Sequence, residues 1–171
     1  LAFTFPDFAV TVEEEKKQAA DPKAAEEVKS ELNEIIGLSE VKDYVLSLEQ
    51  NYIIQRLREA RGMKADVPTM HMIFTGNPGT GKTTIARLVS RYLKAMGVLS
   101  GGQLIEVTRA DLVGKYVGHT APLTQQVIRS ALGGVLFIDE AYSLYRGADD
   151  SFGLEAIDTI VKGMEDHRED L

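Results

Sequence analysis

One short motif constrains this chain more than any other feature. Residues 76–83 read GNPGTGKT, which is the pattern G-x-x-x-x-G-K-[ST], and they stand between a short apolar run and an amphipathic stretch. The glycines let the backbone wrap closely with its N–H groups pointing inward, and a helix that follows adds its positive N-terminal end. A random chain of this length would match the pattern on the order of one per cent of the time. The motif therefore predicts a strand–loop–helix unit that binds phosphate groups.

The residue types in this motif assign roles within it. Lys82 can reach the β- and γ-phosphates of a nucleotide, and the Thr83 hydroxyl can ligate Mg²⁺. The expected cofactors are ATP and Mg²⁺. The nucleotide-binding residues predicted here are Asn77, Pro78, Gly79, Thr80, Gly81, Lys82, Thr83 and Thr84.

An acidic pair, Asp139-Glu140, directly follows the apolar run 135–138. Ligands of open α/β sheets sit at the carboxyl ends of the strands, so Asp139 is placed to hold Mg²⁺ through its water shell. Glu140 is placed to polarise the water that attacks the γ-phosphate, as a general base. Taken alone, the pair could equally cap an exposed strand end. Behind a phosphate-binding loop, the catalytic interpretation is favoured.

Two further segments have open alternatives. In residues 112–120, Gly114 and Gly118 bracket Lys-Tyr-Val, which could present Tyr116 to a peptide or bury it in the core under a tight turn. Upstream, Ile36 and Gly37 precede a helix and could wall an adenine pocket or form core. The residues by themselves do not choose in either case.

Composition excludes several classes of protein. The 171 residues are 44% hydrophobic and 26% charged with a net charge of -7, which is typical of a globular domain and argues against a nucleic-acid partner. Cysteine is absent, which excludes disulfides, thiolate catalysis and Cys-ligated zinc; the three histidines form no zinc-hydrolase motif. No apolar run approaches the roughly 18 residues of a membrane span. We expect a cytoplasmic protein that contacts no membrane.

Periodicity predicts alternating helices and strands from residue 34 onward. Expected helices begin at Asp21-Pro22, at Ser39, at Gly81, at Thr120 as a cap, and at Gly153 with Val161 inward; expected strands cover 70–75, 104–108 and 135–138. This order is typical of a doubly wound parallel α/β sheet. We interpret residues 1–33 as an N-terminal arm or linker and 34–171 as the nucleotide-binding subdomain.

Three motifs in order carry a family resemblance: GNPGTGKTT, TRADLVGKYVGHTAP and VLFIDEAYSLYR. Together they resemble the CbxX/CfxQ group of AAA+ ATPases, which includes red-type Rubisco activases, stage V sporulation protein K and ATPases of type VII secretion. The resemblance runs from about residue 32 to residue 171. It implies a P-loop NTPase fold and a hexameric ring that remodels a protein substrate by pulling on it in a central pore.

The resemblance also implies roles for single residues. Residues 76–83 would be Walker A, and Asp139 and Glu140 Walker B. Ile36 and Gly37 would border adenine. Tyr116, with Val117, would form the pore loop that grips the substrate.

One departure from the family pattern affects the expected activity. An AAA+ module continues into a sensor-1 strand, an arginine finger and a helical lid, none of which this sequence contains. In this family the sensor-1 strand lies between the Walker A and Walker B strands, so its absence would leave inner strands with unpaired backbone groups. Because an arginine finger is worth roughly 10³–10⁵ in rate, we expect weak ATP turnover or none from these residues alone.

Two other functions remain alternatives. A P-loop kinase of a small molecule or nucleotide would share the phosphate loop, but a water-activating Glu140 and the Tyr116 loop speak against it. A nucleotide-binding or assembly module without turnover would fit the missing elements.

Overall fold

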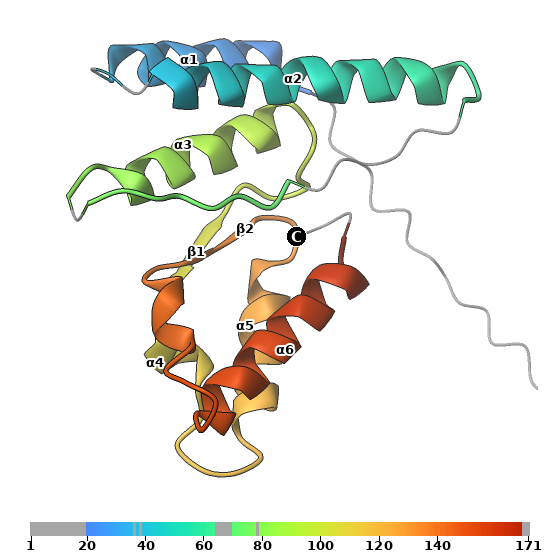
Figure 1. Cartoon of the computed structure of the whole chain (residues 1–171). Coiled ribbons are helices and arrows are strands. Elements are labelled where there is room, and N and C mark those ends of the chain that lie inside the picture. Colours follow the sequence, from blue (N-terminus) through green and yellow to red (C-terminus); the bar gives the residue numbers. More distant parts are fainter. Residues whose placement is uncertain (1–19, 36, 38, 64–69, 78, 169–171) are drawn as a thin grey trace, which may run out of the picture.

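The computed structural model describes residues 20–35, 37, 39–63, 70–77 and 79–168. Figure 1 shows α1 and α2 side by side over α3, with two strands beneath α3 and the remaining helices beyond them. The elements are α1 (Pro22–Glu34), α2 (Ser39–Ala60), α3 (Lys82–Ala95), β1 (Leu104–Val107), α4 (Arg109–Leu112), α5 (Thr120–Ala131), β2 (Val135–Ile138), the 3-10 turn η1 (Ala141–Leu144) and α6 (Ser151–Asp166).

β1 and β2 form a parallel sheet, in register from Leu104 opposite Val135 to Val107 opposite Ile138. Parallel neighbours need a crossover, and α4 and α5 supply it. Both strands occupy the expected positions. The α/β class with a parallel sheet is confirmed.

The strand expected at 70–75 is not formed. Residues 70–77 run without regular secondary structure, and Ile73 is 92% exposed. Among the described residues the sheet contains only β1 and β2. A strand needs a hydrogen-bonding neighbour as well as apolar side chains, and this segment lies across a cleft from β2. The sequence pattern identifies these residues as apolar, but it does not show whether a neighbouring strand is present to pair with them.

Two separate apolar cores support the site. The first surrounds α3, where buried side chains of α1 and α2 meet the P-loop helix; it includes Val28, Leu32, Val45, Leu88 and Tyr92. The second lies under the sheet and consists of Val107, Leu112, Leu144 and Ala156 with partly buried neighbours. The described part of the predicted N-terminal arm, α1, thus packs directly on the P-loop helix.

Three local predictions need correction. Thr120 begins α5 but does not cap it: the residue is fully buried, and its Oγ1 accepts a hydrogen bond from Gly114 N. α6 begins at Ser151, not at Gly153, because the Asp150 side chain accepts from Gly153 N. Val161 is 49% exposed, not inward. None of the described helices is long and apolar enough to cross a membrane.

Candidate functional site

The loop before α3 has the backbone of a phosphate cradle. Gly79 and Gly81 have φ values of 77° and 83°, a region that residues with a Cβ rarely adopt. Gly81 is the N-cap of α3, so the loop passes directly into the first free N–H groups of that helix. Thr80 Oγ1 donates to Asn77 O at 2.8 Å and tightens the turn. The predicted residue Pro78 lies outside the described residues.

Lys82 folds back over this loop. Its Nζ donates to the carbonyl oxygens of Gly76 at 3.1 Å and Asn77 at 2.9 Å. The ammonium group is therefore already positioned at the mouth of the loop by two backbone acceptors. A phosphate oxygen can replace either of them without a change in the path of the helix, because the charge sits on a flexible stem.

The loop and the acidic pair face one cleft of about 1180 Å³. Its walls carry Lys82, Thr83 and Thr84 from one side and Asp139 and Glu140 from the other. The remaining lining is largely apolar and includes Met72, Phe74, Val89, Leu93, Leu136 and Phe137. Sequence reasoning missed one contribution to this cleft, which comes from α2 through Tyr52, Gln55, Arg56 and Glu59.

The Walker B residues hold a particular backbone conformation. Asp139 N donates to Val107 O at 2.8 Å, which extends the ladder of the sheet by one bond. Asp139 Oδ1 accepts from Glu140 N at 2.9 Å. Glu140 then turns the chain with a φ of 49°, the one positive φ among described residues other than glycine. Such conformations are sparsely populated and are concentrated at functional sites.

Oxygen ligands suited to Mg²⁺ lie in this cleft. Thr83 and Asp139 both line it, and hydroxyl and carboxylate oxygens are the donors that Mg²⁺ prefers. In phosphate sites this ion takes one or two protein ligands and completes its shell with water and phosphate. The described residues include no group of three or more His, Asp or Glu side chains that could hold a metal ion by themselves. The residues present therefore fit a metal held jointly with a nucleotide.

Tyr142 lies at the edge of the same cleft and was not foreseen. Its side chain is exposed, and the negative charge of Glu140 raises the pKa of its phenol. A signal did exist in the sequence, since Tyr142 stands two residues after Glu140, close enough for the carboxylate charge to act on its phenol.

The Tyr116 loop is exposed and closed at its base. Tyr116 and Val117 are 68% and 88% exposed, which excludes the core interpretation of Tyr116. The Tyr116 ring packs edge-on against His119 at 5.5 Å between centroids. Gly114 leaves no room for a side chain, because a Cβ there would lie 2.7 Å from His119 Cβ. The loop thus presents its apolar tip on a tight base.

Only Gly37 of the two predicted adenine contacts is among the described residues, and it does not line this cleft. Ile36 lies outside the described residues. Gly37 has a φ of 81° and is not among the described residues that line the cleft. The structure brings together Walker A and Walker B, but it does not bring Gly37 to them.

Comparison with known proteins agrees with this geometry. The family model described as "ATPase family associated with various cellular activities (AAA)" matches residues 72–171, more than half of the chain. The chain belongs to the AAA family. The match begins just before the phosphate loop and includes the sheet, the acidic pair and α6. A P-loop NTPase fold follows from this membership.

Three curated relatives are about half identical to this chain over most of its length. Stage V sporulation protein K of Bacillus subtilis is 48% identical over 151 residues, covering 88% of this chain and 47% of the relative. The chloroplastic ribulose bisphosphate carboxylase/oxygenase activase of Cyanidioschyzon merolae is 51% identical over 140 residues, covering 81% of this chain and 46% of the relative. Protein CbbX of Cereibacter sphaeroides is 49% identical over 149 residues, covering 86% of this chain and 48% of the relative. The expected resemblance to the CbxX/CfxQ group is confirmed, and the chain spans about half the length of these relatives.

Proposed function

We propose that this chain binds Mg²⁺-ATP in the cleft between α3 and β2 and supplies the residues of an ATPase. One observation carries the proposal: the phosphate cradle and the Asp139-Glu140 pair, about 60 residues apart in sequence, line the same cleft. Membership of the AAA family supports the same activity.

Each site residue has a proposed role. The backbone N–H groups of the loop and Lys82 bind the β- and γ-phosphates, with Asn77, Pro78, Gly79, Thr80, Gly81 and Thr84 shaping the cradle. Thr83 and Asp139 hold Mg²⁺, which when bound neutralises phosphate charge. Glu140 accepts the proton of the attacking water. Ile36 remains proposed for the adenine side, whereas Gly37 is left out of the proposal because it does not line this cleft.

The Tyr116-Val117 tip is proposed to contact a protein substrate. Its exposure supports this role, because both side chains are free to contact a partner. One relative is named an activase of another enzyme, which supports a protein substrate here. We further propose that the longer protein works as a homo-oligomer, a hexameric ring in which these loops face the pore.

Nucleotide binding is tested with the chain itself. Mg²⁺-ATP binding is measured by calorimetry for the parent, for Lys82→Ala and for the control Lys94→Ala, an exposed lysine at the other end of the same helix. Loss of charge-assisted bonds to phosphate is expected to weaken binding by about 10- to 100-fold in Lys82→Ala only. Equal binding by all three proteins would contradict the phosphate role of the loop.

Hydrolysis is tested by product analysis on a protein of the relatives' full length. An ATPase releases free phosphate, whereas a kinase leaves a phosphorylated acceptor. Glu140→Gln is expected to bind ATP, to accumulate oligomers and to stop phosphate release. Normal turnover by this variant would show that Glu140 is not the base.

A further inference from the structure

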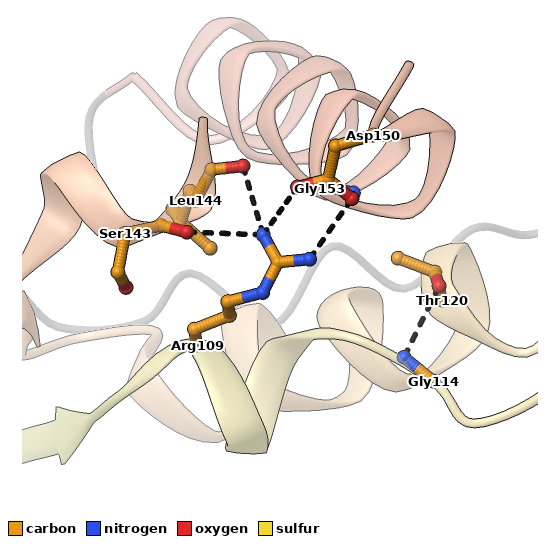
Figure 2. Close-up of polar contacts among 7 residues, drawn as sticks. All are labelled: Arg109, Gly114, Thr120, Ser143, Leu144, Asp150 and Gly153. Atoms are coloured by element: carbon orange, nitrogen blue, oxygen red, sulfur yellow. Dashed lines mark hydrogen bonds and ion pairs between the residues drawn. The ribbon is translucent and has the colours of Figure 1, made fainter. Parts of the chain in front are cut away.

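Arg109, the first residue of α4, forms hydrogen bonds to the segment that follows Glu140 (Figure 2). Its Nη1 donates to the carbonyl oxygens of Ser143 and Leu144, each at 3.0 Å. The guanidinium also pairs with both carboxylate oxygens of Asp150, at 2.7 and 2.9 Å. Only 16% of the Arg109 side chain and 14% of that of Asp150 are exposed. We call these four residues the Arg109 clamp: Nη2 donates to Asp150 Oδ1, while Nη1 donates to the two carbonyl oxygens and forms an ion pair with Asp150 Oδ2.

The clamp residues are closely packed against the start of α6. Asp150 also caps that helix, with Oδ1 accepting from Gly153 N at 3.1 Å, and the hydrogen bond from Arg109 lowers the pKa of Asp150. A Cβ on Gly153 would lie 2.1 Å from Leu144 O and 2.7 Å from Arg109 Nη1. The backbones are therefore in contact around the guanidinium.

The clamp is one hydrogen bond away from the proposed catalytic base. Ser143 N donates to Glu140 O at 2.7 Å, and Ser143 O is one of the acceptors of Arg109. Glu140 holds a positive φ. A rotation of Glu140 toward an ordinary backbone conformation would therefore either break this hydrogen bond or carry Ser143, an acceptor of Arg109, with it.

On its other side the clamp leads to the exposed loop. α4 ends at the fully buried Leu112, whose carbonyl accepts from Thr124 Oγ1 at 2.8 Å. Two residues later Gly114 N donates to Thr120 Oγ1 at 3.1 Å, the contact drawn beside the clamp in Figure 2. These bonds close the base of residues 113–119, with Tyr116 at the tip. A single short helix thus joins the clamp to the loop.

We propose that Arg109 is a positioning residue that couples the backbone at Glu140 to the Tyr116 loop, an inference that rests on the proposed ATPase function. Arg109 does not touch the cleft; it acts through Ser143 and Leu144 on one side and through α4 on the other. Occupation of the cleft by nucleotide then changes the position of the loop that meets the substrate.

A first experiment needs no nucleotide. Hydrogen exchange is followed at the hydrogen-bonded amides of Val113, Gly114 and His119 and of Ser143 and Tyr145. Arg109→Gln is expected to speed exchange of both groups by about tenfold or more, since it removes charged hydrogen bonds. Arg109→Lys is expected to restore part of the protection, because an ammonium donates to the carbonyls but lacks the fork.

Two controls keep this result specific. Arg129→Gln removes an exposed arginine of α5 and should leave both groups of amides unchanged. Asp150→Asn keeps the shape of the side chain but removes the charge that pairs with Arg109. It therefore tests the coupling between the two groups of amides if Arg109→Gln does not fold. Faster exchange at Ser143 and Tyr145, with the loop amides unchanged, would overturn the proposal.

A second experiment measures the coupling to nucleotide. The chain contains no tryptophan, so Tyr116→Trp introduces a single fluorescent reporter at the loop tip. Mg²⁺-ATP is expected to shift the emission of this reporter. Adding Arg109→Gln should abolish the shift while changing nucleotide affinity by less than about twofold, because the clamp lies outside the cleft.

The outcomes separate the two proposals. Binding of Mg²⁺-ATP without an emission shift in the reporter, or a shift that survives Arg109→Gln, overturns the coupling and leaves the nucleotide site intact. If the reporter and the parent chain bind no nucleotide, the proposed function fails, and the exchange experiment alone decides whether Arg109 links the two segments.

Discussion

The two walls of the cleft are built in different ways. The Walker A wall consists of helices: α1, α2 and α3 share one core, and residues 70–77 cross it outside any sheet. The Walker B wall consists of the two strands with α4, α5 and α6 beneath them. The phosphate loop is thus held by the helix that follows it, whereas the acidic pair is held by the strand that precedes it. Most of each core comes from one wall, and Val135 of β2 also packs against the first core.

Each wall also has one polar cluster that joins three elements. In the Walker A wall, Glu49 of α2 accepts a hydrogen bond from Lys29 of α1 at 3.2 Å and one from the Tyr92 hydroxyl of α3 at 2.9 Å. Burial, followed by the hydrogen bond to Glu49, raises the pKa of Tyr92 to about 12. In the Walker B wall the Arg109 clamp joins α4, η1 and α6. The first cluster lies among packed helices, while the second borders an exposed loop.

Contacts across the cleft are few by comparison. The rings of Phe74 and Phe137 meet edge-on at 6.3 Å between centroids. Ser90 Oγ of α3 lies 3.1 Å from Gly102 O and 3.3 Å from Gln103 O, just before β1. Because most buried side chains of each core come from one wall, we expect the two walls to respond separately to mutation.

The largest expected effect is a loss of stability that is confined to one wall. Leu112→Ala removes a fully buried side chain from the second core and is expected to cost about 2–5 kcal/mol of unfolding free energy. Leu93→Ala makes the matched change in the first core. Residue-resolved hydrogen exchange should show loss of protection confined to the mutated wall in each case. Loss across both walls would show that the cores unfold as one.

The next effect concerns the clamp. Gly153→Ala places a Cβ against Leu144 O and Arg109 and is expected to cost about 1–3 kcal/mol by overpacking. Gly147→Ala is a comparison in the same segment: its Cβ meets nothing within 4 Å, although its φ of 120° strains any side chain. Thermal unfolding of both variants separates steric contact from backbone strain. Equal losses would argue against the close contact at Gly153.

A smaller effect is expected at acid pH. Burial alone would raise the pKa of Glu49, but hydrogen bonds from Lys29 and Tyr92 outweigh it and lower this pKa below 4.5. The folded state therefore binds the proton less readily, so this contribution is present above pH 4.5 and is lost as the pH falls through the folded pKa. Glu49→Gln should lose less stability than the parent between pH 6 and pH 3, by about 1–2 kcal/mol. Exposed Glu34→Gln, measured by the same denaturant titrations, should follow the parent.

The smallest effect has the opposite sign. Glu140→Gly relieves a positive φ and is expected to stabilise the Walker B wall by about 1 kcal/mol, while it removes the proposed base. Glu140→Ala also removes the carboxylate but keeps the strain. Chemical denaturation should place the glycine variant above the alanine variant; the reverse order would show that the conformation of Glu140 is unstrained.

Much of the fold was predictable because its signals are local. Asp21-Pro22 begins α1, Gly81 precedes α3, and the run 135–138 is β2, each from residue types that act on their own backbone. The strand at 70–75 could not be judged in this way, since pairing depends on a neighbour that lies elsewhere in the chain. Thr120 failed for a similar reason: its hydroxyl binds Gly114 across the loop and does not cap its own helix.

The residues of the site likewise divide into those that a local motif predicts and those that depend on distant parts of the chain. The motifs predicted the loop and the acidic pair, and the structure has both on one cleft; their chemical roles stay predictions. The Arg109 clamp left no such signal, because its partners lie 34 to 41 residues further along the chain. The α2 side of the cleft was missed because its polar residues follow no motif.

The sheet of the described residues has a consequence for how the chain behaves in solution. β2 is a run of four uncharged side chains, and within the described residues it pairs with β1 on one side only. Such an edge is a template for pairing with another molecule, and the net charge of -7 opposes that encounter by repulsion. Salt screens this repulsion over a Debye length of about 8 Å at physiological ionic strength. Raising the ionic strength of the buffer is therefore expected to favour association of this chain through the free edge of β2.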